Sequence, residues 1–254
     1  MVFARKRFGQ NFLQDTAVID QIVHALQATP QDVVIEIGPG RGALTKVLLE
    51  RLTHLVVIEI DNDLFHQLKF LPHSEKLEAI NADVLNVDFH QFGNSLRVIG
   101  NLPYNISTPL MFHLLKYRHL IKDMVFMLQA EVVDRMMAPP SSSEYGRLSV
   151  MFQYYCELEK IIDVPPECFN PVPKVMSSVI ALRPKKQEES VAFDVLEEVV
   201  SKAFAMRRKT LANNFKGIFS QTDWENLGLS SQLRAQDLAI ADFVKIAAYY
   251  SKID

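Results

Sequence analysis

The sequence predicts an α/β fold: a mostly parallel sheet with helices on both faces, followed by a small C-terminal α-helical domain. Over the first two-thirds of the chain, short apolar runs alternate with longer amphipathic stretches, and residues 192–254 have a helical pattern almost throughout. Alternation of strands and helices is typical of a parallel sheet with right-handed crossovers. We therefore expect one large domain over residues 1–185 and a helical domain over residues 190–254.

Five apolar runs mark the expected strands of the parallel sheet. In chain order they are VVIEIG (33–38), LVVIEID (55–61), LEAINAD (77–83), RVIGNLPY (97–104) and DMVFMLQ (123–129). The segments between them predict helices over 43–52, 63–70 and 108–116. In such a sheet the loops after each strand gather along one edge, so residues that follow different strands are expected to meet there.

The pattern changes after residue 145. Residues 148–164 and 174–184 are expected to form further strands, a hairpin-like pair that closes one edge of the sheet. Between them VPPECFNPVPK contains four prolines, which predicts a stiff, extended loop.

Composition limits the function only weakly. The chain has 254 residues, of which 48% are hydrophobic and 22% charged, which is ordinary for a soluble globular protein. It contains no apolar stretch of 18 residues, and its basic N-terminus is not followed by an apolar run, so we expect neither a membrane span nor a secretory signal. Cys156 and Cys168 have no Cys or His partners nearby in sequence, which favours free thiols in a reducing cytoplasm over a metal site or a disulfide.

Positive charge is clustered, although the net charge is −3. The segment 202–216 holds five basic residues and no acidic one. Two smaller clusters are Arg5, Lys6 and Arg7, and Arg183, Lys185 and Lys186. A single such run is usually a solvated helix face, whereas three in a slightly acidic chain favour a surface that faces RNA or DNA.

The segment EIGPGRG, residues 36–42, lies where the first strand meets the first helix. Its glycines, beginning with Gly38, let the backbone turn tightly and let a ligand approach closely. No phosphate-binding lysine follows, which excludes a P-loop. Glu59 ends the second strand, where an acid would accept hydrogen bonds from ribose hydroxyls, and Asp83 ends the third, where it could meet an adenine amino group. Either acid alone could be a helix cap, but together they predict a site for a nucleoside-like ligand such as S-adenosylmethionine.

The tetrad Asn101-Leu102-Pro103-Tyr104 follows the fourth strand and is expected at the same sheet edge. An adenine amine is a poor nucleophile because its lone pair is delocalised into the ring. Its N–H groups could be bound by the Asn101 side-chain oxygen and by the backbone carbonyl of Leu102 or Pro103, which would favour a more nucleophilic nitrogen. Tyr104 offers a ring on which the base can stack. The alternative is a structural turn with a core tyrosine.

Two residues of the proline-rich region extend this hypothesis. Phe169 is expected to supply the second face of a base sandwich, or else to anchor its loop in the core. Lys174 is expected to lie close enough to meet phosphate.

Five segments resemble the ribosomal RNA adenine dimethyltransferases, most closely the branch that acts on the small subunit. They are RFGQNFL (7–13), EIGPGRGALT (36–45), NLPYNISTPL (101–110), FNPVPKVMSSVIAL (169–182) and RRKTLANNFK (207–216). The resemblance covers nearly the whole chain. It implies a Rossmann-like class I methyltransferase fold that uses S-adenosylmethionine and no metal.

The resemblance also implies roles for individual residues. Asn11 and Leu13 would cover the methionine end of the cofactor. Its remaining contacts would come from Gly38, Glu59, Asp83 and Asn101. Tyr104 and Phe169 would hold the target base. The RNA-facing elements would be the basic N-terminal arm with Arg5, Lys6 and Arg7, and the basic segment that begins with Arg207, Arg208 and Lys209.

The implied substrate is a pair of adjacent adenosines in the loop of the hairpin near the 3′ end of 16S rRNA, read within an immature 30S subunit. Each would receive two methyl groups, and we expect a monomeric, cytoplasmic enzyme with a role in subunit biogenesis. Three alternatives stay open: a large-subunit methyltransferase of the macrolide-resistance type, a DNA adenine or protein glutamine methylase, and a non-catalytic assembly factor. The Gly-Pro-Gly turn and residues 207–216 favour the small-subunit enzyme over the first. Methylases of the second kind usually carry two prolines in the tetrad, whereas here Leu102 precedes Pro103. The intact set of cofactor residues argues against the third.

Overall fold

The computed structural model describes residues 10–186 and 190–253, and the chain divides into two compact units. The first unit comprises Met1–Val133 and Glu157–Pro184, and the second comprises Asp134–Cys156 and Lys185–Asp254. The sequence places the division at residues 185–190. In the structure residues 134–156 also belong to the second unit, because the helix they contain packs against two of the C-terminal helices.

A seven-stranded sheet forms the centre of the first unit, in the order β4-β3-β2-β5-β6-β9-β7. Its strands are β2 (Val34–Ile37), β3 (Leu55–Glu59), β4 (Leu77–Asn81), β5 (Leu96–Asn101), β6 (Ile121–Gln129), β7 (Cys156–Val164) and β9 (Ser177–Pro184). The five strands from β2 to β6 are parallel, and β9 pairs antiparallel with β6. The predicted mostly parallel sheet is therefore confirmed, as is the addition of two later strands at one edge.

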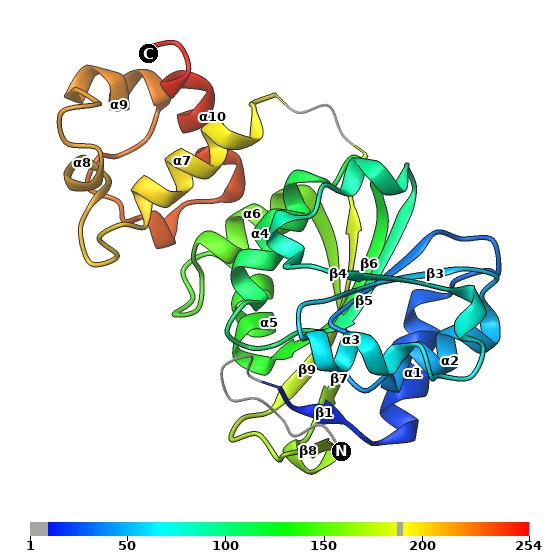
Figure 1. Ribbon diagram of the computed structural model, residues 1–254. Helices are drawn as coiled ribbons and strands as arrows, with labels where there is room; N and C mark the ends of the chain where they lie inside the picture. The colour runs from blue at the N-terminus through cyan, green and yellow to red at the C-terminus, as the bar shows by residue number, and fades with distance from the viewer. Residues whose placement is uncertain (1–9, 187–189, 254) are drawn as a thin grey trace. The chain divides into compact units, whose positions relative to one another are not determined.

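Helices cover both faces of this sheet. They are α1 (Thr16–Leu26), α2 (Ala43–Arg51), α3 (Asn62–Leu68) and α4 (Ser107–Lys116). Figure 1 shows α1 and α2 side by side on one face, with α4 on the other. The sequence predicts the last three helices but not α1. That helix begins at Asp15, whose side chain accepts a hydrogen bond from the Val18 N–H, and it buries an apolar stripe against the sheet.

A short two-stranded sheet brings the N-terminal segment to the proline-rich region. β1 (Phe12–Leu13) pairs antiparallel with β8 (Phe169–Asn170). The turn η5 (Pro166–Cys168) precedes β8. The prediction of one extended loop over residues 164–174 is therefore wrong in detail. The middle of this segment forms the turn η5, and the strand β8 that follows it pairs with β1.

The strand predicted over residues 148–164 is wrong in its first half. Arg147–Tyr155 form helix α6, and the strand β7 begins only at Cys156. Six of the nine residues of α6 are buried. A helix buried on most sides lacks the polar face that gives helical periodicity, and its apolar run then resembles a buried strand.

The second unit is helical. Its helices after α6 are α7 (Phe193–Ala203), α8 (Leu211–Asn214), α9 (Gln221–Leu227) and α10 (Ile240–Tyr250), and α5 (Ala130–Met137) precedes α6 across the division. This unit also contains the 3-10 turn η6 (Ala235–Asp237), whereas the 3-10 turns η2 (Ser74–Lys76), η3 (Val84–Asn86) and η4 (Phe89–Phe92) belong to the first unit. The ring of Phe204 stacks on that of the buried Phe243, and Trp224 is buried among further aromatic rings.

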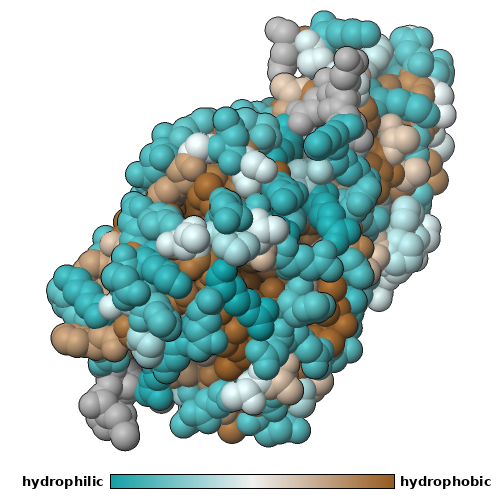
Figure 2. Space-filling view, turned by 90° about the vertical axis from the view of Figure 1, so that its right-hand side faces the viewer, coloured by the Kyte–Doolittle hydropathy of each residue, from teal (hydrophilic) through white to brown (hydrophobic). Residues whose placement is uncertain are grey.

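No helix in residues 10–186 and 190–253 is both long and apolar enough to cross a membrane. Figure 2 shows a face of the molecule that is mostly hydrophilic, with apolar residues visible between the polar ones.

Candidate active site

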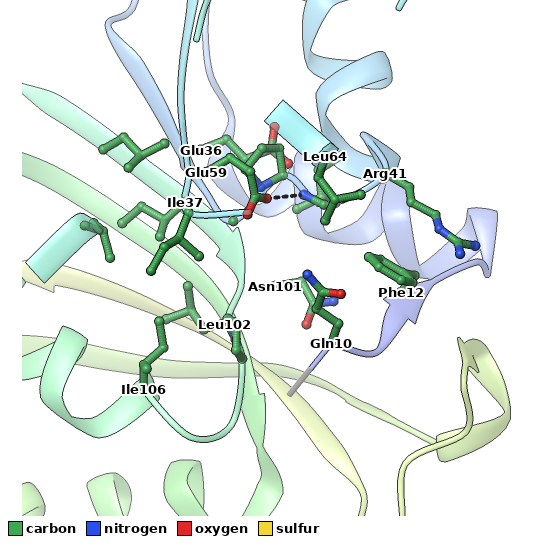
Figure 3. Close-up of a pocket in the computed structure, with 18 of the residues that line it drawn as sticks. Gln10, Phe12, Glu36, Ile37, Arg41, Glu59, Leu64, Asn101, Leu102 and Ile106 are labelled. Carbon is green, nitrogen blue, oxygen red and sulfur yellow. Dashed lines mark hydrogen bonds between the residues drawn. The ribbon is translucent and has the colours of Figure 1, made fainter. Parts of the chain in front are cut away.

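A pocket lies in the first unit at the carboxyl ends of the parallel strands (Figure 3). It contains all of the residues predicted to hold a cofactor, together with the whole tetrad. These residues are Asn11, Leu13, Gly38, Glu59, Asp83, Asn101, Leu102, Pro103 and Tyr104. The reason they meet is the expected one, because the ends of parallel strands lie at a single sheet edge.

The glycine turn between β2 and α2 forms the floor of this pocket. Gly38 has φ +66°, a left-handed conformation that favours glycine, and its N–H donates to the Ile58 carbonyl at 2.9 Å. The turn depends on a second glycine that the sequence reasoning did not single out. A Cβ on Gly100 would lie 2.5 Å from the carbonyl oxygen of Ile37, so only glycine lets β5 approach β2 this closely.

Glu59 joins the end of β3 to the glycine turn. One carboxylate oxygen accepts the Gly40 N–H at 3.1 Å (Figure 3), and the other accepts the Asp61 N–H at 2.8 Å. The side chain is buried, and burial raises its pKa above the usual value. Glu59 is thus held in a fixed orientation at the pocket wall.

Glu36, in the middle of β2, is a pocket residue that the sequence reasoning missed. It is 1% exposed, and the Thr45 hydroxyl donates to it at 2.7 Å. Burial, with a smaller contribution from the charge of Glu59, raises the pKa of Glu36 to about 8. Its carboxyl is therefore largely protonated near neutral pH. The feature of the sequence that indicates this role is an acidic residue inside an otherwise apolar strand.

Asp83 is a helix cap at the edge of the pocket, and its contact with an adenine amino group stays a prediction. It lines the pocket, and it also caps η3, where its Oδ1 accepts the Leu85 N–H at 3.0 Å. One of its carboxylate oxygens is thus used by the cap.

The tetrad is held by hydrogen bonds at each of its residues. The Asn101 amide nitrogen donates to the Asn11 carbonyl at 3.1 Å. A carbonyl can only accept, so this bond fixes which end of the amide is nitrogen and directs Oδ1 elsewhere. The Leu102 N–H donates to the Met127 carbonyl at 3.1 Å, and the Pro103 carbonyl accepts the Ile106 N–H at 3.2 Å.

The rim of the pocket includes further residues that the sequence reasoning missed. The Arg41 guanidinium lies 4.3 Å from the centre of the Phe12 ring (Figure 3). Gln10 donates to Asp61 at 3.3 Å. These contacts tie the N-terminal segment to the glycine turn and to the loop after β3. These contacts join residues that are distant in sequence, so no local sequence pattern predicts them.

Phe169 is not among the pocket residues. Its side chain is 2% exposed and packs in the hydrophobic core of the first unit, although its strand pairs with the pocket strand β1. The position therefore fits the anchor alternative in the structure as it stands, and its contact with a base remains a prediction.

The predicted RNA-binding residues that the structure describes belong to both units. Lys174 is exposed in the first unit, and Arg208 and Lys209 are exposed in the second. Arg207 donates hydrogen bonds to the carbonyls of Ser143 and Tyr145, so it also holds a loop of its own unit. The predicted RNA-binding residues Arg5, Lys6 and Arg7 lie outside the part of the chain that the structure describes. Within the described part of the chain, no cluster of three His, Cys, Asp or Glu side chains is placed to hold a metal.

The mostly parallel sheet, the glycine turn after its first parallel strand and the acid at the end of the next define a Rossmann-like class I methyltransferase fold. The sequence matches the ribosomal RNA adenine dimethylase family over residues 1–252, and the chain belongs to that family.

Curated relatives match nearly the whole length of the chain. It is 53% identical to the ribosomal RNA small subunit methyltransferase A of Legionella pneumophila (strain Corby), over 97% of this chain and 98% of the relative. It is 52% identical to the protein of the same name from Chromobacterium violaceum, over 96% of this chain and 94% of the relative.

Two solved structures are also similar. A dimethyladenosine transferase from Plasmodium falciparum has a TM-score of 0.80 at 27% identity and covers 95% of this chain and 98% of its own. The 23S rRNA methyltransferase ErmE has a TM-score of 0.68 at 22% identity, over 95% of this chain and 100% of its own. The second likeness supports the fold alone.

Proposed function

We propose that this methyltransferase uses S-adenosylmethionine to dimethylate the N6 amines of two adjacent adenosines in the 3′-terminal hairpin loop of 16S rRNA, within the 30S subunit. The observation that carries the proposal is the juxtaposition in one pocket of the glycine turn, the Glu59 carboxylate and an oriented Asn101 amide. The small subunit is the target because relatives about half identical over nearly the full length carry that name.

The pocket residues fit S-adenosylmethionine. The fixed Glu59 carboxylate suits ribose hydroxyls, and Asp83 suits an adenine amino group. The turn at Gly38 lets the ligand approach the backbone, and Asn11 and Leu13 lie where they could cover the methionine end. When bound, this group would supply an electrophilic methyl.

The acceptors for the target amine are proposed to be Asn101 Oδ1 and a backbone carbonyl. The Asn101 nitrogen is already used by Asn11, which leaves the oxygen for an N–H donor. The Pro103 carbonyl already accepts the Ile106 N–H, so the Leu102 carbonyl is the better second acceptor. No strong general base is required, since an alkylated amine loses its proton readily to water. The catalytic contribution of these residues is positioning and electrostatics.

The half-buried ring of Tyr104 lines the pocket and is the proposed stacking surface for the base. A sandwich with Phe169 would require that ring to leave the core, because it is 2% exposed. Lys174, Arg207, Arg208 and Lys209 are proposed to contact RNA phosphates, and we expect the enzyme to act as a monomer in the cytoplasm, where its substrate is assembled.

Methyl transfer from labelled S-adenosylmethionine tests this proposal. Small and large subunits lacking these methyl groups would be compared as substrates, with Asn101→Ala as the matched inactive variant and thermal unfolding to show that it folds. We expect label in small subunits only, and almost none with the variant. Label in large subunits would instead support the macrolide-resistance alternative, and no label in either would support a non-catalytic factor.

A further inference from the structure

The phenol of Tyr104 is bound by a side chain that lies far from it in sequence. Tyr104 Oη lies 2.8 Å from Ser177 Oγ, across 73 residues of chain. Ser177 is the first residue of β9 and is fully buried. It pairs in register with Gln129 of β6, and the adjacent Ala130 N–H donates to the Met176 carbonyl at 3.0 Å. The Ser177 hydroxyl is therefore fixed to the sheet.

Tyr104 itself lies in the loop between β5 and α4, so its backbone is less constrained than the backbone of a strand residue. Its carbonyl accepts the Ser107 hydroxyl at 3.1 Å. The residue is thus held at both ends, by one serine at the backbone and by another at the phenol. Because Oη lies on the axis of the Cβ–Cγ bond, the phenol contact leaves the ring free to turn about that axis. It fixes the direction of the axis, and so where the ring lies.

We propose that Ser177 is a positioning residue for methyl transfer, which places the Tyr104 ring where the target base stacks. This inference rests on the proposed function. Without the contact, a half-buried ring on a loop can swing about its Cα–Cβ bond. A base that follows the ring would then be displaced from Asn101 and from the methyl donor. Displacement of a reacting group by about 1 Å can cost on the order of 100-fold in rate.

The chain provides a matched control for a merely structural role. Ser178 is the next residue of β9, and it is equally buried. Its hydroxyl donates to Asp163 at 2.6 Å, whereas the phenol of Tyr104 is hydrogen-bonded to Ser177. Ser178→Ala therefore removes a buried serine hydrogen bond from the same strand and leaves the ring in place.

The test compares the wild type, Ser177→Ala, Tyr104→Phe and the double variant. For each protein, kcat and KM are measured for methyl transfer to small subunits, together with the Kd of S-adenosylhomocysteine. We expect each single variant to lower kcat about tenfold. The double variant should fall no further, because both changes remove the same contact. Ser177→Thr, which keeps the hydroxyl, should restore most of the rate. The Kd should stay within about twofold throughout, and Ser178→Ala should keep a wild-type kcat.

Three results would overturn the inference: an unchanged kcat in Ser177→Ala, single effects that multiply in the double variant, or an equal fall in Ser178→Ala. If the wild-type protein transfers no methyl groups, the proposed function fails instead. In that case, crystal structures of the wild type and Ser177→Ala test whether Ser177 positions the Tyr104 ring, independently of any activity measurement. A ring in the same place in both structures would contradict it, and a displaced ring would support it.

Discussion

Glu36→Gln should change how the stability of the protein depends on pH. Glu36 is 1% exposed inside β2 and accepts one hydrogen bond from Thr45. Glutamine has nearly the same shape, keeps an oxygen for Thr45 and cannot ionise. The variant therefore resembles the protonated form of the wild type at every pH.

The expected magnitude follows from the pKa of the buried carboxyl, which burial raises from 4.5 to about 8. Below pH 4.5 the group is neutral in the folded and unfolded states, and its burial has no ionic cost. Between pH 4.5 and 8 the unfolded chain ionises while the folded protein resists, so stability is lost as pH rises; above 8 the loss is constant. A shift of this size corresponds to about 5 kcal/mol, of which about 4 kcal/mol falls between pH 5 and pH 9.

Urea unfolding of both proteins at pH 5 and pH 9 measures this difference. The free energy of unfolding of Glu36→Gln minus that of the wild type should be larger at pH 9 than at pH 5 by about 4 kcal/mol, so the variant gains stability relative to the wild type as pH rises. Glu50→Gln is the matched control: Glu50 is exposed on α2, so its carboxylate remains in water in both states. An equal difference between wild type and Glu36→Gln at the two pH values would refute the reasoning.

Three further predictions concern packing, a buried ion pair and RNA binding. Gly100→Ala should lower the free energy of unfolding by about 1–3 kcal/mol, because its Cβ would lie 2.5 Å from a backbone oxygen; a variant as stable as wild type in urea would contradict the close approach. Asp123→Asn should cost about 2 kcal/mol in the same assay, because the buried Arg97 loses a carboxylate 2.6 Å from its guanidinium and keeps only Asp32, at 2.9 Å, as an acidic partner. A loss below about 1 kcal/mol would mean that the Arg97–Asp123 pair contributes no more than a surface ion pair. Arg208→Glu with Lys209→Glu should weaken binding to small subunits and flatten its salt dependence, and an unchanged slope in a salt titration would place the RNA surface elsewhere.

The sequence was informative about the fold where burial follows a simple pattern. The five parallel strands are short apolar runs that end at glycine or polar residues, and each was found near its expected place. The strand predicted over residues 148–155 is wrong because these residues form α6, a helix that is buried on most sides and has no polar stripe. The grouping of residues 134–156 with the C-terminal helices depends on packing between distant segments, which a single sequence does not encode locally.

The site was predictable to the extent that it depends on strand ends. Gly38, Glu59, Asp83 and Asn101 lie at or just after the ends of four different strands, and parallel topology alone brings them together. The contact of Ser177 with the tetrad joins two remote segments, and Gly100 matters only because two backbones approach closely. Neither fact is visible in a local motif.

Phe169 illustrates a second reason why a site residue is hard to predict from sequence. An aromatic residue in a proline-rich segment can be a core anchor or a binding wall, and the sequence supports both. The structure shows the ring in the core, while its strand is paired with the strand that lines the pocket. A crystal structure with the target RNA bound tests the proposed contact, which requires the Phe169 ring to leave the core.

Mass spectrometry of 16S rRNA is the most direct test of the central claim. Small subunits lacking these methyl groups would be incubated with the purified protein and S-adenosylmethionine, and the 3′-terminal hairpin would be digested and sequenced. The account predicts N6,N6-dimethyladenosine at two adjacent positions in the hairpin loop and at no other adenosine. Methyl groups at any other position, or an unmodified hairpin, would contradict it.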